Sequence, residues 1–380
     1  MTVKPASSAI APGMPPRRPG ARKKRRSFWG FLLLYAVSFC MFFAILFSIW
    51  FYLTPWGADL RYMMADTLIT TQHRDWAKYL IGSSALEERV AAYMKQFNDM
   101  GDKPDERVSE PAVAVTSPQK PKEPYEIEPV EGKGFKGYIV YINDPTKLRV
   151  IVPNRVGKGE KVTSMVQRTG ALLGINGGGF IDPNWEGNGF QPEGTVMSGG
   201  QIYYNDSDKK TKQHMIGIDK TGRLIAGNYS ANELLQMGVQ EAVSFSPRFI
   251  VNGEGQIKNQ ADGWGIAPRT CIGQTRDGRI VFAVIDGRQP GHSIGATLYD
   301  VQKLFLERDV VIAANLDGGS STVLVKGTAG AKPEIVNKPS SEYGERYLPT
   351  AWLLYDNPQT VLNKNIWEGL DIRKIDPSKW

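Results

Sequence analysis

An uninterrupted apolar segment near the start of the chain is the feature that most constrains how this protein can fold. From Phe28 to Leu53 no side chain carries a charge. About 20 such residues suffice for a helix to cross the hydrocarbon core of a membrane. A cleaved signal peptide would have an apolar region of about 7–15 residues followed by small residues at its cleavage site. Bulky aromatic residues end this longer segment, so we predict one uncleaved transmembrane helix over 28–53.

Basic residues on one side of the segment predict its orientation. Residues 1–27 contain eight Lys and Arg and no Asp or Glu. Basic flanks stay in the cytoplasm, so we expect a disordered cytoplasmic tail over 1–27 and a single-pass protein of the cell membrane, with the rest of the chain outside. Removing these eight charges from the total of +7 leaves −1 for residues 54–380. The basic balance therefore belongs to the tail and does not indicate a nucleic-acid-binding domain.

Composition divides the rest of the chain into four segments. Residues 54–100 carry apolar side chains at helical spacing and predict membrane-proximal helices. Residues 101–133 contain six Pro among Lys and Glu, which predicts an extended linker. Residues 134–356 have the turn-rich pattern of a globular domain. Residues 357–380 form a C-terminal tail that either packs back on the domain or reaches a partner.

Two patterns recur in the globular segment and predict its fold class. Apolar runs separated by Asp-Pro, Thr-Gly or Asp-Gly turns predict three β-hairpins, over 137–152, 216–225 and 272–281. A short helix, a buried strand and a polar Gly-rich loop follow one another three times, over 163–179, 230–253 and 297–321. We therefore predict an α/β (α+β) domain with a mixed β-sheet core, short helices and Gly-rich loops at strand ends. Ligand sites in α/β sheets favour such strand-end crevices.

Four segments place charged or amide side chains beside glycines at the expected strand ends. They are 176–180 (Asn-Gly-Gly-Gly-Phe), 267–273 (Ala-Pro-Arg-Thr-Cys-Ile-Gly), 285–288 (Ile-Asp-Gly-Arg) and 315–322 (Asn-Leu-Asp-Gly-Gly-Ser-Ser-Thr). Glycines let main-chain N–H groups approach an anion closely. Arginine holds a phosphate through forked hydrogen bonds, and cleavage of a glycosidic bond needs two carboxyl groups beside it. The combination predicts an anion-binding site with acid or base groups.

In this order, the four segments resemble the phosphodiester glycosidase family, over about 134–356. The resemblance implies hydrolysis of a sugar-1-phosphodiester of the N-acetylglucosamine-1-phosphate type. The 315–322 segment is the most specific part, although Ser320 stands where the family loop often has a third Gly. Bacterial relatives of this kind are often associated with exopolysaccharide or the cell envelope, so an envelope polysaccharide or a teichoic-acid-like polymer is the expected substrate.

The resemblance also implies roles for individual residues. Asp317 and Asp286 are the expected catalytic carboxyl groups, and Glu193 is a further carboxylate near a glycine. The expected substrate-binding residues are Asn176, Gly177, Gly178, Arg269, Thr270, Arg288, Asn315, Gly318, Gly319 and Ser321. Two indole rings, those of Trp185 and Trp264, stack on a sugar in this interpretation, or else belong to the core.

Two alternatives stay open from the sequence. A non-catalytic polysaccharide-binding or scaffold protein would have Asp286 and Asp317 far apart or facing away from any cleft. A metal-dependent phosphodiesterase would use Asp286, Asp317 and Asn176 to bind calcium or magnesium, which prefer oxygen ligands. Zinc is not expected, because His214 and His292 fit no zinc-ligand spacing and the two Cys lie far apart in the sequence. We expect no required cofactor, with calcium or magnesium as the alternative.

Overall fold

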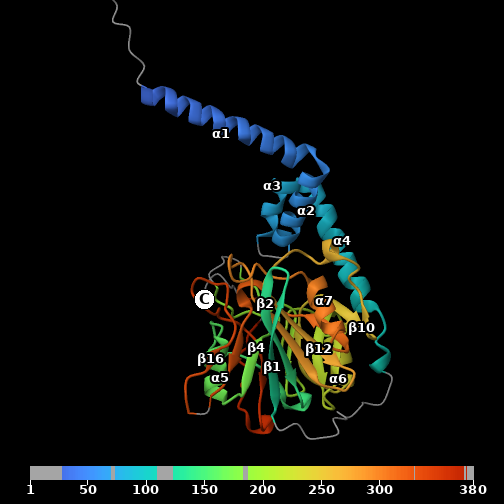
Figure 1. The fold of residues 1–380 in the computed structure, drawn as a ribbon. Coiled ribbons are helices and arrows are strands. Elements are labelled where there is room, and N and C mark those ends of the chain that lie inside the picture. Colours follow the sequence, from blue (N-terminus) through green and yellow to red (C-terminus); the bar gives the residue numbers. More distant parts are fainter. Residues whose placement is uncertain are drawn as a thin grey trace, which may run out of the picture. The chain divides into compact units, whose positions relative to one another are not determined.

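The computed structural model describes residues 28–69, 73–108, 123–182, 187–328, 330–371 and 374. The chain forms two compact units, which divide between Leu60 and Arg61. The predicted span is one helix, α1 (Phe28–Leu53), which is long and apolar enough to cross a membrane (Figure 1). It is the one such helix among the described residues. The predicted basic tail, 1–27, lies outside them.

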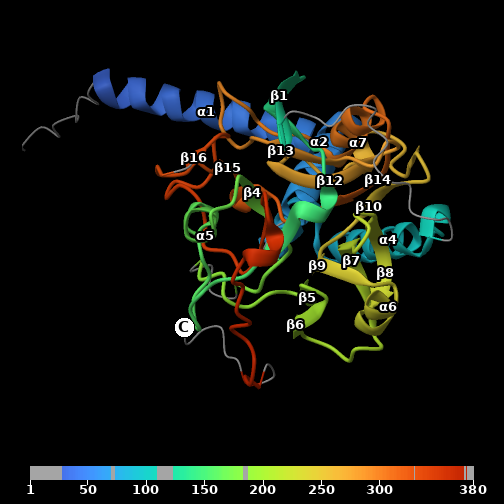
Figure 2. The same ribbon diagram turned by 90° about the horizontal axis from the view of Figure 1, so that it is seen from below.

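Helical segments follow α1, as the apolar spacing over 54–100 indicates. They are α2 (Pro55–Ile69), the 3₁₀ turn η1 (Arg74–Ala77), α3 (Lys78–Ile81), α4 (Ser83–Asp102) and the 3₁₀ turn η2 (Glu106–Val108). Helix α4 packs along strands β8 (Leu224–Ser230) and β10 (Arg248–Val251), as Figures 1 and 2 show. The helix is therefore part of the folded second unit and not a separate spacer.

The C-terminal end of α4 is fixed to the sheets by a buried arginine. The Arg248 guanidinium is fully buried and donates hydrogen bonds to the carbonyl oxygens of Met100 (3.1 Å), Ala226 (2.8 Å) and Lys103. A buried cation is stable only when its donors are satisfied. A Cβ added to Gly227 would lie 2.7 Å from the Gly101 oxygen. The close approach and the shared hydrogen bonds hold α4 on the domain.

The predicted linker over 101–133 differs from the structure at both ends. Residues 101–108 dock on the domain, where the Glu106 N–H donates to Asn252 Oδ1 at 3.1 Å. Strand β1 (Tyr125–Gly132) pairs along its whole length with β2 (Phe135–Ile142). Composition misled here because proline is tolerated in an edge strand such as β1. Between these ends, residues 109–122 lie outside the described part of the chain.

Three antiparallel sheets form the domain, which confirms the predicted mixed α+β class. The largest has the order β1-β2-β13-β12-β14-β10-β11. Its remaining strands are β13 (Ile280–Ile285), β12 (Arg269–Thr275), β14 (Val310–Asn315) and β11 (Glu254–Gly255).

The two smaller sheets have five strands each. One has the order β16-β15-β4-β17-β3, with β16 (Glu334–Ile335), β15 (Leu324–Lys326), β4 (Leu173–Asn176), β17 (Ala351–Leu354) and β3 (Leu148–Ile151). The other has the order β6-β5-β9-β7-β8, with β6 (Gln201–Asn205), β5 (Thr195–Ser198), β9 (Val239–Ser244) and β7 (Lys212–Asp219).

The three helix–strand–loop units form as predicted. Their helices are α5 (Val162–Thr169), α6 (Ala231–Gln236) and α7 (Leu298–Leu306), and each precedes a buried strand: β4, β9 and β14. Gly170 ends α5 with a φ of 68°, a left-handed conformation that glycine adopts without steric cost. Side-chain capping boxes start α6 at Ser230 and α7 at Thr297.

Two of the three predicted hairpins form, and the first does not. β7 pairs with β8, and β12 with β13, across the expected Gly turns. The 137–152 hairpin is wrong, because β2 pairs with β1 and β13 whereas β3 pairs with β17 in another sheet. A 3₁₀ turn, Pro145–Lys147, separates β2 from β3, and the Asp144 carboxylate caps it by accepting the Thr146 N–H at 3.1 Å.

Apolar side chains from all three sheets meet in the interior. Among them are Val140, Ile216 and Trp352, none of which is exposed. Trp367 of the C-terminal segment joins this cluster and donates its indole N–H to the Phe190 carbonyl at 3.2 Å. The described part of the tail therefore packs back on the domain.

Candidate functional site

A pocket of about 560 Å³ collects most of the charged motif residues. The predicted residues that line it are Arg269, Arg288, Asn315, Asp317, Gly318, Gly319 and Ser321, and Glu193 and Trp264 line it as well. Parts of the chain outside the four motifs also contribute, and these are helix α4, the segment before it, residues 245–247, Leu298 and Arg346.

Strand pairing explains why distant motifs meet there. Arg269, the first residue of β12, pairs with Ile285 at the end of β13. Two residues further, Cys271 pairs with Asn315, the last residue of β14. Antiparallel neighbours place the start of one strand beside the end of the next. The loops after β13 and β14 therefore leave the same edge of the sheet, beside the start of β12.

Asp317 is the group best placed for proton transfer. Part of the surface of Asp317 is exposed to solvent. Its carboxylate oxygen Oδ2, however, is buried and has no hydrogen-bond partner among the described residues. Burial raises the pKa of Asp317 to about 6, against the Ser321 hydroxyl, the Arg346 charge and the Gly318 amide, which lower it. A carboxyl group with such a pKa holds a proton close to neutral pH.

Glu193 supplies a second carboxyl group to the same pocket. Its main-chain N–H donates to the Gly179 carbonyl at 3.0 Å, and its side chain opens into the pocket. Partial desolvation there and the Asp206 charge raise its pKa, whereas the Arg74 charge lowers it. The Glu193 charge also raises the pKa of Asp317. The two carboxyl groups are therefore electrostatically coupled.

Arg269 is held by main-chain carbonyl groups. Its side chain is buried and donates to the oxygens of Trp264 (2.7 Å), Gly265 (2.8 Å) and Ala296 (3.2 Å). Burial lowers its pKa to about 10, so it stays charged at neutral pH. Arg269 thus brings a fixed positive charge to the pocket wall and also orders the loop before β12.

Two further arginines face Asp317 from the other loops. Arg288 has a φ of 58° and its guanidinium lies against Gly319, 3.3 Å from where a Cβ would be. Arg346 lies 4.9 Å from the centre of the Phe180 ring, pairs with Asp182, and donates to Ser320 Oγ at 3.4 Å. Nothing in the local sequence around Arg346 predicts this position.

Asn176 lies behind the pocket and not in its lining. Its Oδ1 accepts from the Thr270 hydroxyl (2.8 Å) and the Val323 N–H (3.2 Å), while its amide donates to the Asp317 carbonyl. The Asp317 N–H in turn donates to the Gly177 carbonyl at 3.2 Å. Asn176, Gly177 and Thr270 therefore position the Asp317 loop, where the sequence predicted that they bind substrate.

Gly178 also lies outside the pocket lining. Its N–H donates to Thr350 Oγ1 at 3.0 Å, and a Cβ there would lie 2.7 Å from the Ser244 carbonyl. The glycine permits the close approach of the loop after β4 to the end of β9 and does not line the pocket.

Asp286, for which the sequence predicts a catalytic role, does not line the pocket. Its Oδ1 accepts from Asn337 Nδ2 and from the Lys338 N–H, each at 3.0 Å. Its Oδ2 lies 2.8 Å from His292 Nε2. The buried carboxylate joins the loop after β13 to the 337–338 segment. Asp-Gly after a strand did not distinguish this structural role from a catalytic one.

The side chains proposed for a metal site are dispersed. Asn176 and Asp286 are held by separate hydrogen bonds, and only Asp317 lines the pocket. The described residues contain no group of three or more His, Cys, Asp and Glu side chains that fits a metal ion. His214 is buried between the Phe245 carbonyl and the Arg248 N–H, and burial lowers its pKa to about 4.

Trp264 packs against helix α4 at the base of the pocket. Its ring meets those of Phe97 and Tyr93 edge to face, with centres 4.9 and 6.2 Å apart, and only 1% of the residue is exposed. This packing places it in the core, the second of the two interpretations from sequence. Trp185 lies outside the described residues.

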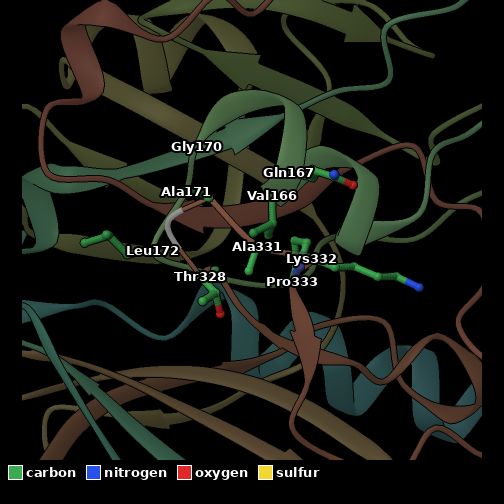
Figure 3. Close-up of a pocket in the computed structure, with 11 residues that line it drawn as sticks. Val166, Gln167, Gly170, Ala171, Leu172, Thr328, Ala331, Lys332 and Pro333 are labelled. Atoms are coloured by element: carbon green, nitrogen blue, oxygen red, sulfur yellow. The ribbon is translucent and has the colours of Figure 1, made fainter.

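A second pocket, of about 500 Å³, has no carboxyl group, histidine, cysteine or arginine among its described lining residues. It lies between α5 and the segment before β16, and its lining includes Val166, Ala171, Leu172 and Pro333 (Figure 3). Lys332 is its one ionisable residue and points away from the other labelled side chains in Figure 3. We therefore take the pocket around Asp317 as the candidate active site.

Residues 169–355, which include Asp317 and Arg269, match the family described as phosphodiester glycosidase. This domain belongs to the phosphodiester glycosidase family. The family match excludes the anchor, helix α4 and strands β1–β3.

Curated relatives of this phosphodiester glycosidase domain are distant. An SPbeta prophage-derived uncharacterized protein, YomE, of Bacillus subtilis is 30% identical over 186 residues, which is 47% of this chain and 27% of the relative. The mouse N-acetylglucosamine-1-phosphodiester alpha-N-acetylglucosaminidase is 25% identical over 227 residues, 53% of this chain and 42% of that enzyme. The chain thus spans less than half the length of these relatives.

A solved structure supports the fold of the phosphodiester glycosidase domain. The catalytic domain of the zebrafish N-acetylglucosamine-1-phosphodiester alpha-N-acetylglucosaminidase superposes with a TM-score of 0.50 at 22% identity. The match covers 65% of this chain and 87% of the zebrafish domain. At this identity the likeness establishes the fold.

Proposed function

We propose that this domain hydrolyses a sugar-1-phosphodiester, of the N-acetylglucosamine-1-phosphate type. The observation that carries the proposal is Asp317, whose carboxyl group has a pKa of about 6 and an unpartnered, shielded Oδ2. It lies in a pocket that also contains a second carboxyl group and four arginines. Proton donors and phosphate-binding cations are what cleavage of such a bond requires.

Four charged residues of the pocket have roles in the proposed reaction. Arg288 and Arg346 bind the phosphate, since their guanidinium groups face the Asp317 loop from two sides. Protonated Asp317 gives its proton to the oxygen between the anomeric carbon and phosphorus. The bond from the anomeric carbon to that oxygen breaks, and its electron pair leaves with the phosphate. A water molecule supplies the new hydroxyl group, and Glu193 takes its proton.

Location narrows the substrate in the same proposal. Helix α1 anchors the chain, the basic tail remains in the cytoplasm, and the pocket opens outside the membrane. The substrates are then envelope polysaccharides or teichoic-acid-like polymers with sugar-1-phosphodiester bonds. The relatives support the reaction class, since the mouse enzyme is named for this linkage.

The alternatives make different predictions for one assay. Full-length protein in detergent is incubated with an aryl N-acetylglucosamine 1-phosphodiester and with UDP-N-acetylglucosamine, and release of free sugar is measured. Asp317→Asn should lower turnover by about 10²–10⁴-fold, as for loss of a general acid. Asp277→Asn, in the β12–β13 turn, is the matched control and should retain turnover.

Equal turnover of Asp317→Asn and wild type would refute the catalytic proposal, and binding without turnover would favour the scaffold alternative. Activity lost in EDTA and restored by calcium or magnesium would favour the metal-dependent one.

A further inference from the structure

The pocket has a second wall that the family match does not include. Ile69 and Arg74, together with Val90, Met94 and Phe97 of helix α4, line it along with the charged loops. All of these residues precede residue 169, where the family match begins. The segment between the anchor and the domain is therefore part of the candidate active site.

Electrostatics and packing show independently that this wall faces the catalytic groups. The Arg74 charge lowers the pKa of Glu193, so the two side chains lie within electrostatic reach. Phe97 packs edge to face on Trp264, which orders the loop that holds Arg269. Helix α4 is itself fixed to the sheets through Arg248.

The two walls differ in polarity. The loops contribute Asp317, Glu193 and three of the four arginines, whereas helix α4 contributes Val90, Met94 and Phe97 and the segment before it contributes Arg74. Met94 keeps 44% of its surface exposed although it is apolar. Exposed apolar surface beside a charged site favours a ligand with one charged and one apolar part.

We infer that the substrate is a glycosyl phospholipid, in which a sugar-1-phosphate is esterified to a long-chain alcohol. The inference rests on the proposed function and names the group beyond the phosphate. The alcohol chain lies along Val90, Met94 and Phe97 while the arginines hold the phosphate. Water adds to the anomeric carbon, the bond from that carbon to the bridging oxygen breaks, and the products are the free sugar and the phosphomonoester of the alcohol.

Two substrates that differ only in the alcohol test this inference. Full-length protein in detergent micelles is given N-acetylglucosamine 1-phosphodiesters of methanol and of farnesol, and kcat/KM is measured for each. The farnesyl diester should be hydrolysed with a kcat/KM at least about tenfold higher, since each buried methylene contributes about 0.8 kcal/mol. Met94→Asn should lower the farnesyl-to-methyl ratio about tenfold. Because the ratio is taken within one preparation, partial unfolding cancels.

Met63→Asn is the matched control, because Met63 has the same exposed fraction to within one per cent (45% against 44%) and does not line the pocket. It should leave the ratio unchanged. Equal kcat/KM for the two diesters, or an equal effect of both Met variants on the ratio, would overturn the lipid inference while the glycosidase proposal stands. No turnover of either diester would overturn both.

Discussion

Asp317→Asn should stabilise the protein at neutral pH while it abolishes activity. In the folded state the pKa of Asp317 is raised from 3.8 to about 6. A shift of about 2.2 units at 1.36 kcal/mol per unit is worth about 3 kcal/mol. Between pH 3.8 and 6 the folded state binds this proton and the unfolded state does not, so stability falls as pH rises through that window. Above pH 6 the ionised Asp317 destabilises the folded state by the full amount of about 3 kcal/mol. The neutral side chain of Asn at this position removes that destabilisation.

Thermal unfolding in detergent as a function of pH measures this effect. At pH 7.5 the Asp317→Asn variant should unfold several degrees above wild type, and the difference should shrink toward zero at pH 4, where the wild-type carboxyl group is neutral. Asp277→Asn is the control, and it should lower the unfolding temperature at pH 7.5 where Asp317→Asn raises it. Burial opposes ionisation there, but the Thr275 hydroxyl and the Arg279 charge outweigh it and lower the pKa of Asp277. Equal unfolding temperatures for wild type and Asp317→Asn at pH 7.5, or a difference independent of pH, would refute the reasoning.

Three further predictions follow from the contacts of the domain. Asp286→Ala should reduce the free energy of unfolding by about 1–3 kcal/mol, since it leaves buried donors without an acceptor. The variant should retain its turnover per folded molecule. Loss of turnover in protein shown to be folded would indicate that Asp286 takes part in the reaction. Gly227→Ala should cost about 1–3 kcal/mol in chemical denaturation, because φ there is 143° and the new Cβ would meet the Gly101 oxygen at 2.7 Å; an unchanged midpoint would contradict the close packing. Cleavage at a protease site inserted within 109–122 should leave the two fragments associated during native affinity purification through the N-terminus, and release of the C-terminal fragment would show that α4 does not hold the domain.

The elements that the sequence predicted correctly depend on near neighbours. Helix α1 follows from a run of apolar residues, and α5 ends at Gly170 because glycine tolerates the left-handed conformation. The two Gly-turn hairpins likewise need only the residues between their strands. The hairpin at 137–152 failed because β2 pairs with β1 on one side and with β13 on the other, and β13 lies far from β2 in the sequence.

The site shows the same division between local and distant signals. Asp317 and Arg269 stand in short motifs and were predicted, and the pocket contains both. Asp286 stands in an equally suggestive motif, but its hydrogen bonds to Asn337 and Lys338 depend on a segment some 50 residues away. No short sequence motif marks Arg346 or the pocket-lining residues of α4. Their positions come from tertiary packing, which periodicity cannot reveal.

The buried Arg248 has a consequence for how this architecture can be inherited. Its donors are satisfied only by carbonyl groups of α4 and the residue after it together with a strand of the domain. A phosphodiester glycosidase domain transferred without the segment from 61 to 108 would lose the carbonyl partners that Met100 and Lys103 give to Arg248, together with one wall of the pocket. We therefore expect a domain joined to an unrelated tether to be less stable unless position 248 changes with it.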